Sequence, residues 1–549
     1  MNHQLVTSDY IVFAIYFVIV AGYGYYIYNR KRKANADTKD FFLAEGSLTW
    51  WAIGASLIAS NISAEQFIGM SGSGFKMGLA ISTYEWMAAA TLLVVAIFFL
   101  PIYLKNKIYT MPQFLSQRYN GTVATIMAVF WLLLYVFVNL TSILYLGALA
   151  VSTISGFSFT ACMIGLAVFA IIITLGGMKV IGFTDVIQVF FLILGGLATT
   201  YLALNLVSHH FGGGTIGEAT NTMNGMWDGL GLLRQKAPEH FHMIFDKSNA
   251  NYKELPGLAV LIGGMWIVNL NYWGCNQYIT QRALGADLKT ARNGLLFAGF
   301  LKLLMPIIVV LPGIATYVLW KNGMFADEMQ GVVDGVKQVK PDRAYPILLN
   351  LLPAGLKGLS FAALTAAIVA SLAGKANSIA TIFTLDIYKK HFKKEATDAE
   401  QVNIGRIAIV VSCIIAALVA PALGNLDQAF QFIQEYTGFI SPGVFAIFIM
   451  GFFWKRTTSA AALVGAALAI PLSVALMLIF PDLPFINRMG WVFVIIVALM
   501  VIISLMDPKS KDNPKALQID TGMFKLAPGF AVGAIIICGI LTALYTIFW

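Results

Sequence analysis

The chain has 549 residues, of which 58% are hydrophobic and only 11% are charged. A soluble protein of this length would carry about 25% charged residues, so the composition argues against a soluble globular protein and indicates a membrane protein. The net charge is +9, but the basic residues lie in short segments between apolar runs, which is the pattern of membrane topology rather than of a nucleic-acid-binding face.

Apolar runs long enough to cross about 30 Å of hydrocarbon recur from one end of the chain to the other. We therefore predict an all-α polytopic membrane protein with about fourteen transmembrane helices. In chain order the predicted spans are 10–28, 50–70, 80–103, 124–153, 159–175, 183–206, 256–278, 294–320, 358–386, 405–423, 429–452, 458–480, 487–505 and 527–549. The basic cluster 30–33 follows the first span, which is too long for a signal-peptide core, so this span is read as a permanent helix.

The distribution of lysine and arginine predicts the orientation of the chain. These residues are enriched in the loops that would be cytoplasmic if the N-terminus lies outside. The two long polar stretches, 207–255 and 321–357, would then be outer loops, and the C-terminus would also lie outside. We expect a single transporter domain over 1–549 in the inner (plasma) membrane, without a soluble signalling domain.

Two of the spans, the second and the seventh, are interrupted by polar residues and glycines. The second contains the polar run 61–66, and the seventh contains the polar run 269–277. Both read as discontinuous helices whose freed backbone groups can bind a ligand or an ion. The alternative is that these polar residues only hold neighbouring helices together.

Five crossings separate the two broken spans, so the spans run in opposite directions through the membrane. We therefore predict two inverted repeats, 50–206 and 256–452, each opened by a broken helix. The helix over 10–28 precedes this core, and additional helices over 458–549 follow it. The arrangement predicts a binding site near the membrane midplane and transport by alternating access.

Residues 40–56 read DFFLAEGSLTWWAIGAS, which resembles the opening motif of the sodium/solute symporter family. The stretches 50–86, 266–282, 361–388 and 430–443 are similar to the SGLT group of that family, which includes the bacterial sodium/galactose symporter. The resemblance covers most of the chain. It implies a LeuT-type core of five plus five helices, and symport of sodium with a hexose of the galactose or glucose type.

The resemblance also implies a sugar site. Six residues match the hydroxyl-binding side chains or lie beside them, namely Asn61, Gln66, Glu85, Asn269, Lys302 and Gln434. Tyr272 matches the aromatic that covers the sugar on the inner side, and Met70, Tyr84 and Phe430 match the outer gate. The chemistry agrees, because a hexose needs amides, a carboxylate and an ammonium around its hydroxyls. The pair Glu85 and Lys302 could instead be a structural ion pair. Ala88 replaces a serine of the family, which leaves the preferred hexose open.

The resemblance implies that sodium, the only cofactor expected, is bound by the carbonyls of Ala59, Ile62 and Ala367 and by the hydroxyl of Ser371. Ala370 stands where the family has a second serine, and Lys375, one helical turn beyond Ser371, is a departure from the pattern. Two readings of Lys375 stay open. Its chain could reach cytoplasmic water, or its charge, partnered by Asp185, could replace sodium and leave proton-coupled or uncoupled transport.

A function of another class is a proton-translocating subunit of a membrane complex, which can also have about fourteen helices with buried Lys and Glu. Such a subunit needs a chain of titratable groups along the membrane, whereas here the buried charges gather around two broken helices. No enzymatic activity is predicted. The expected partners are a small sugar, sodium or a proton, and the lipid bilayer, with no nucleic acid.

Overall fold

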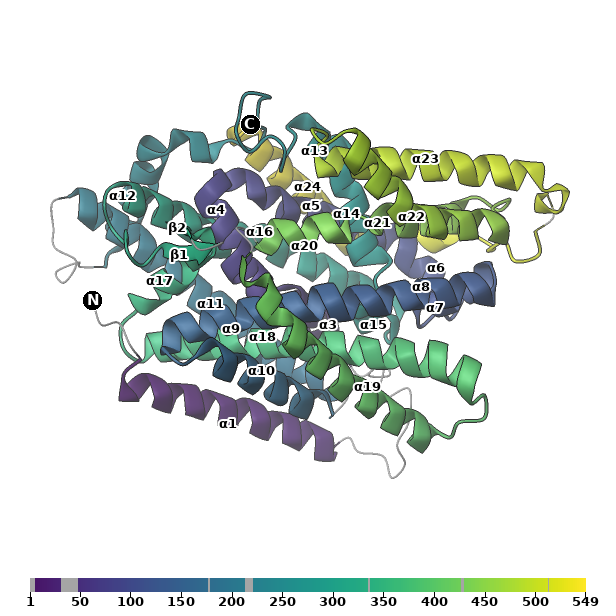
Figure 1. Cartoon of the computed structure of the whole chain (residues 1–549), viewed down its shortest axis with the longest axis horizontal. Helices are drawn as coiled ribbons and strands as arrows, with labels where there is room; N and C mark the ends of the chain where they lie inside the picture. The colour runs from purple at the N-terminus through teal and green to yellow at the C-terminus, as the bar shows by residue number, and fades with distance from the viewer. Residues whose placement is uncertain are drawn as a thin grey trace.

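A computed structural model describes residues 5–30, 48–175, 178–212, 221–333, 336–425, 429–511 and 513–549, which form a helical protein (Figure 1). Most of the long helices run roughly along the longest axis of the molecule in Figure 1. Residues 40–47 of the opening motif and most of the basic cluster after the first span lie outside the described residues.

The first third of the chain begins with the extra helix α1 (Thr7–Arg30). The predicted first repeat then contains α3 (Trp50–Asn61), α4 (Ser71–Met77), α5 (Thr83–Val94), α6 (Leu100–Lys105), α7 (Met111–Arg118), α8 (Gly121–Leu133), α9 (Thr141–Ser155), α10 (Phe159–Thr174) and α11 (Met178–Phe211). Turns of π-helix, η1 (Glu65–Met70), η3 (Val95–Phe99) and η4 (Leu134–Leu140), connect several of these helices without ending the span. Insertions of this kind are frequent at functional sites.

The predicted second repeat follows the loop helix α12 (Met223–Lys236). It contains α13 (Leu258–Ile262), α14 (Gly264–Gly274), α15 (Gln277–Leu284), α16 (Leu288–Lys321), α17 (Ala344–Asn350), α18 (Leu356–Thr381), α19 (Asp398–Val419), α20 (Ala429–Thr437) and α21 (Ser441–Phe453). Strands β1 (Gln330–Val333) and β2 (Val336–Val339) form a small antiparallel hairpin in the loop before α17. The chain ends with α22 (Ser459–Ile479), α23 (Phe485–Met506) and α24 (Pro528–Ile547).

Helices lie at all fourteen predicted spans. In the described part of the chain, nine helices are long and apolar enough to cross a membrane, or ten if the bent pair α20 and α21 forms one span. The broken second and seventh spans fall below that length because each consists of shorter helices. The chain is therefore a multi-pass membrane protein, and the number of crossings stays a prediction.

Both termini and both long loops lie at the same end of the molecule. Asp9, near the start of α1, accepts hydrogen bonds from the backbone amides of Gly355 and Gly358 at 2.7 and 3.0 Å. At the other terminus, the backbone amide of Met243 donates to the carbonyl of Phe548 at 2.7 Å. This arrangement agrees with the prediction that these four segments share one side of the membrane.

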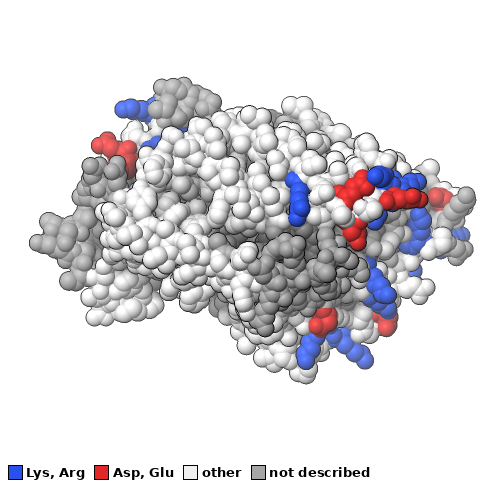
Figure 2. Space-filling view, turned by 90° about the horizontal axis from the view of Figure 1, so that it is seen from below, with Lys and Arg blue, Asp and Glu red and all other residues white. Residues whose placement is uncertain are grey.

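At the opposite end of the molecule, arginine side chains link the loops that are predicted to be cytoplasmic. Arg118 on α7 donates to the carbonyls of Gly451 and Thr457, and Arg292 on α16 donates to those of Ala96 and Lys525. On the face shown in Figure 2, charged side chains gather towards the two ends, and a wide uncharged surface separates them. A band of this kind is what a surface in contact with hydrocarbon requires.

Helices α3 and α16 cross in close contact because glycines face each other. A Cβ atom on Gly54 would lie 2.8 Å from the carbonyl oxygen of Gly294, and one on Gly294 would lie 3.1 Å from that of Trp50. Small residues allow membrane helices to approach in this way. The contact holds the first broken helix against α16, which carries Lys302.

Candidate functional site: a central cavity between two broken helices

The second predicted span is broken immediately after α3. Ile62 leaves the helical conformation at φ −79° and ψ 102°, and helical structure resumes at Glu65. The side chain of Gln66 accepts a hydrogen bond from the backbone amide of Ser63 at 3.1 Å. A polar side chain thus satisfies one backbone donor that the break exposes, which is necessary inside a membrane.

The seventh predicted span is broken between α14 and α15. Cys275 interrupts the helix, and the side chain of Asn276 caps α15 by accepting from the backbone amide of Tyr278 at 3.1 Å. The hydroxyl of Tyr135 donates to the same side-chain oxygen. Both helices are therefore discontinuous where their polar runs predicted.

A central cavity lies between these breaks and comprises, with its mouth, about 860 Å³ of space between protein atoms. All ten residues predicted for the sugar site and its gates line it, namely Asn61, Gln66, Met70, Tyr84, Glu85, Asn269, Tyr272, Lys302, Phe430 and Gln434. Ala88 also lines the cavity.

A buried ion pair forms one wall of the cavity. The ammonium of Lys302 on α16 lies 2.5 Å from a carboxylate oxygen of Glu85 on α5, and the two side chains are 1% and 3% exposed. Lys302 also donates to the side-chain oxygen of Asn61, and its ammonium lies 5.2 Å from the ring centroid of Trp273. Glu85 and Lys302 therefore do form an ion pair, which the sequence analysis gave as an alternative to sugar binding, and both side chains also line the cavity.

The amides complete this wall. Asn61 donates to the hydroxyl of Tyr272 at 3.2 Å, which connects the first broken helix to the second. Asn269 on α14 donates to the carbonyl of Met265 one turn earlier at 3.2 Å. Gln434 reaches the cavity from α20. Donors and acceptors from five helical segments therefore face the same volume.

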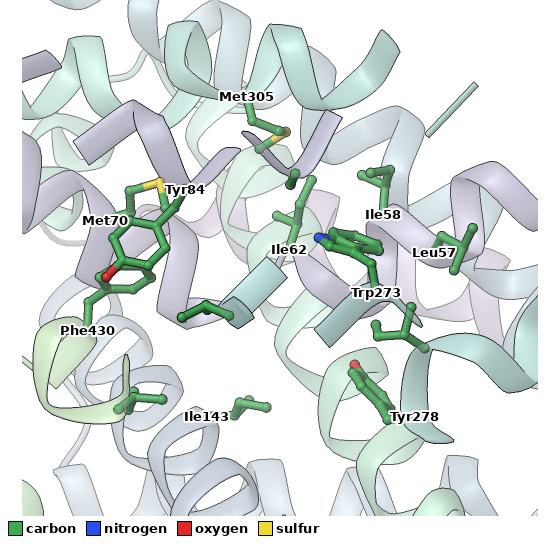
Figure 3. Close-up of a cluster of buried hydrophobic side chains, with 14 of the residues drawn as sticks. Leu57, Ile58, Ile62, Met70, Tyr84, Ile143, Trp273, Tyr278, Met305 and Phe430 are labelled. Atoms are coloured by element: carbon green, nitrogen blue, oxygen red, sulfur yellow. The ribbon is translucent and has the colours of Figure 1, made fainter. Parts of the chain in front are cut away.

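The residues predicted for the outer gate form a closed aromatic cluster. The rings of Tyr84 and Phe430 meet edge to face with centroids 5.3 Å apart. Met70 is fully buried beside them, and Figure 3 shows the three side chains packed together. A Cβ atom on Gly69 would lie 2.9 Å from the Cβ of Phe430, so only glycine permits this approach. The three side chains predicted for the gate are therefore packed together and buried in the structure.

The residues predicted for the sodium site lie where α18 meets the break in α3. The hydroxyl of Ser371 donates to the carbonyls of Ala59 and Ser60 at 3.3 and 3.5 Å. The carbonyl of Ser60 also accepts a hydrogen bond from the hydroxyl of Tyr278. The remaining predicted positions are buried in the same segments, namely Ile62 at the break, and Ala367 and Ala370 on α18.

Lys375 does not reach water. Its side chain is 3% exposed, and its ammonium lies 3.1 Å from the side-chain oxygen of Asn139, which accepts a hydrogen bond. The ring centroid of Tyr278 lies 4.0 Å from the same ammonium. The expectation that Lys375 extends to cytoplasmic water is therefore wrong for this structure, because tyrosine rings and an amide enclose the charge.

The expected partnership of Lys375 with Asp185 is also corrected. Asp185 on α11 accepts a hydrogen bond from the hydroxyl of Ser56 at 2.6 Å, and that hydroxyl accepts one from Arg282 at 3.1 Å. Lys375 instead shares the lining of the central cavity with Glu65, the first residue of η1.

Sequence reasoning assigned no role to Glu65, Asn139 or Asn276, although all three line the cavity, and it assigned Lys375 to the ion site only. Glu65 lies within the polar run of the second span, so the run itself was a signal. Asn139 is an isolated amide in an apolar stretch, and such residues usually face a polar partner inside a membrane protein.

Comparisons with known proteins give the family. The model of the Sodium:solute symporter family matches residues 41–468. A sodium/glucose cotransporter of Vibrio parahaemolyticus is 47% identical over 553 residues, covering 100% of this chain and 99% of the relative. A sodium/myo-inositol cotransporter 2 of Sus scrofa is 33% identical and covers 85% of this chain and 69% of the relative.

The fold is that of solved transporters. A Na⁺-coupled sialic acid symporter, solved in a substrate-bound outward-open state, has a TM-score of 0.75 at 21% identity, covering 91% of this chain and 98% of that one. The expected LeuT-type architecture is confirmed, and family membership removes the alternative of a proton-translocating subunit. This chain is therefore a membrane transporter and not an enzyme, and it belongs to the sodium:solute symporter family.

Proposed function

We propose that this protein is a secondary active transporter that carries a hexose of the galactose or glucose type into the cell together with sodium, by alternating access. The observation that carries the proposal is the central cavity, in which Glu85 and Lys302 meet amide side chains from both broken helices. The name of the Vibrio relative, a sodium/glucose cotransporter, supports the same substrate and ion.

The cavity suits a sugar because its polar groups both donate and accept. A hexose hydroxyl does the same, so the carboxylate of Glu85 accepts, the ammonium of Lys302 donates, and the amides of Gln66, Asn269 and Gln434 do both. A site of this kind selects strongly, because a sugar that lacks one hydroxyl leaves a buried polar group unpaired.

The aromatic residues supply the gates. The cluster of Met70, Tyr84 and Phe430 closes the outer side, and Tyr272 covers the ring on the inner side. Flat rings of this type pack against the apolar face of a pyranose. Opening the two gates in alternation would expose the cavity to one side of the membrane at a time.

Sodium binds, in this proposal, to the oxygens at the break in α3. The carbonyls of Ala59, Ile62 and Ala367 and the hydroxyl of Ser371 are neutral oxygen ligands of the kind that hard cations prefer. The contact between Ser371 and Ala59 supports this placement. Because Ala370 offers no hydroxyl, the site has one ligand fewer than the family pattern and should bind sodium weakly.

The proposed orientation has both termini and both long loops outside, in the inner (plasma) membrane. The gathering of these segments at one end supports their common side. The enrichment of lysine and arginine in the loops of the other end supports assigning that end to the cytoplasm.

The test is uptake of radiolabelled galactose and glucose into proteoliposomes, with sodium and proton gradients imposed separately. Stimulation by an inward sodium gradient is expected, and sodium replaced by choline is the control. Saturable uptake driven only by a proton gradient, or by the sugar gradient alone, would contradict sodium coupling while leaving the sugar assignment intact.

The buried ammonium of Lys375 is the observation that favours the second candidate, which is proton-coupled or uncoupled transport of the same sugar. Lys375 lies one helical turn beyond Ser371, and a positive charge there would reduce the need for a bound cation. The separate gradients in the same assay distinguish the two candidates.

A further inference from the structure

A buried lysine and a partly buried glutamate line the central cavity beside the proposed sodium site. Lys375 lies on α18 four residues after Ser371, which places the two side chains on the same helix face. Glu65 begins η1, immediately after the break in α3. The two residues therefore come from the two segments that would hold sodium, and both line the cavity.

The surroundings of the Lys375 ammonium suit a positive charge. Asn139 accepts its hydrogen bond at 3.1 Å. The ring centroids of Tyr278, Tyr135 and Tyr272 lie 4.0, 5.1 and 5.8 Å away, all within the range of cation–π attraction. Side chains from η4, α14 and α15 thus surround the ammonium of Lys375.

One tyrosine ring connects this ammonium to the carbonyls of the proposed sodium site. The hydroxyl of Tyr278 donates to the carbonyl of Ser60, and its ring faces Lys375. Figure 3 shows Tyr278 below Trp273 and Ile62. A sodium ion at the break would therefore be repelled by a positive charge on Lys375.

Among the described residues, two charged side chains act on the ammonium of Lys375. Glu65 on η1 has the opposite charge, and Arg282 on α15 has the same charge. Asp185 on α11 is held by Ser56, to which Arg282 also donates, so this carboxylate faces the arginine. Glu65 lines the same cavity as Lys375, and its carboxylate accepts a hydrogen bond from the hydroxyl of Ser142 at 2.8 Å.

We propose that the ammonium of Lys375 is a tethered cation that competes electrostatically with sodium for the site at the break in α3, and that Glu65 sets the strength of this competition. The proposal rests on the proposed sodium coupling and adds a regulatory charge to it. It gives Lys375 and Glu65 opposite effects on sodium affinity, which a purely structural pair would not have.

The test is binding of radioactive sodium to the purified protein, measured by scintillation proximity without sugar and without transport. Lys375→Met keeps the length of the side chain and removes its charge, so sodium should bind about tenfold tighter or more. Glu65→Gln removes the attracting charge, so sodium should bind about tenfold weaker or more. The matched control is Lys289→Met, which removes an exposed lysine near the start of α16 and should change nothing.

Equal sodium affinity in wild type and Lys375→Met would overturn the proposal, as would shifts of the same sign in Lys375→Met and Glu65→Gln. Lys375→Gln, which can still donate to Asn139, provides a second uncharged variant if Lys375→Met does not elute as a monodisperse protein. Sodium binding that appears only in the lysine variants would support the competition and contradict sodium coupling in the wild type. Absence of sodium binding in every protein would overturn both.

Discussion

The pair of Glu85 and Lys302 offers the sharpest test of the sugar site. Glu85→Gln and Lys302→Met each remove one charge and preserve most of the side-chain volume. The double variant removes both charges. Because the side chains are 3% and 1% exposed and lie 2.5 Å apart, each single variant leaves its partner charged, buried and without its counter-ion.

The expected cost follows from that geometry. Breaking a buried ion pair by removing one partner costs about 3–5 kcal/mol. The pair faces a cavity that water can enter, so we expect the lower end, about 3 kcal/mol, for each single variant. The double variant should recover most of this loss, because no charge is left unpaired.

Sugar binding, unlike stability, should not recover in the double variant. A hydrogen bond from an ionised group contributes about 1.5–3 kcal/mol, which corresponds to roughly tenfold to a hundredfold in affinity. Each single variant should therefore lose saturable hexose uptake at ordinary concentrations. The double variant should lose it too, although its fold is restored.

The assay combines thermal unfolding of the detergent-solubilised protein with hexose uptake into proteoliposomes. Single variants that unfold well below the wild type, beside a stable but inactive double variant, would support both roles of the pair. Single variants as stable as the wild type would refute the buried ion pair. Normal uptake by the double variant would refute the role in sugar binding.

Further predictions concern three other positions. Tyr272→Phe should retain transport and Tyr272→Ala should impair it, because the ring face makes the contact; equal uptake by all three proteins would show that Tyr272 only packs. Asp9→Ala should lower the free energy of unfolding by about 2 kcal/mol, because it removes the carboxylate that accepts hydrogen bonds from two backbone amides at the start of α18. Thermal unfolding measures this loss, and Asp228→Ala, at an exposed site of α12, is the matched control. Burial lowers the pKa of His240 in the folded protein, so the unfolded chain binds the proton more readily and stability should fall as the pH drops through about 6.5; His240→Gln should flatten that part of the profile of melting temperature against pH.

Much of the architecture could be predicted because membrane physics leaves a clear signature in sequence. Long apolar runs must be helices, and polar runs inside them mark breaks, since lipid cannot satisfy a free backbone group. The breaks at Ile62 and Cys275 lie within the two polar runs that predicted them. The residues assigned by resemblance to the sugar site also face one cavity, because the breaks bring their helices together.

The partners of Lys375 could not be predicted in the same way. Spacing places Lys375 one turn beyond Ser371, but a lysine side chain is long enough to extend in several directions. Its direction depends on Asn139 and on three tyrosines that come from distant parts of the chain. The resemblance indicated Asp185 as a partner, yet its carboxylate accepts a hydrogen bond from Ser56, and that hydroxyl accepts one from Arg282.

The sugar half and the ion half of this site share one cavity but differ in how closely they follow the family pattern. The sugar half retains every polar residue that the resemblance assigns except the serine replaced by Ala88, whereas the ion half has exchanged a hydroxyl for a methyl at Ala370 and gained an ammonium at Lys375. Both changes act in the same direction, because one removes a ligand and the other adds a repelling charge. Since Glu65 and Lys375 line the cavity that also holds Glu85 and Lys302, a change in ion binding must alter the field in which the sugar is bound. Sodium and sugar affinity should therefore change together in the Lys375 variants, even though Lys375 lies outside the proposed set of sugar-binding residues.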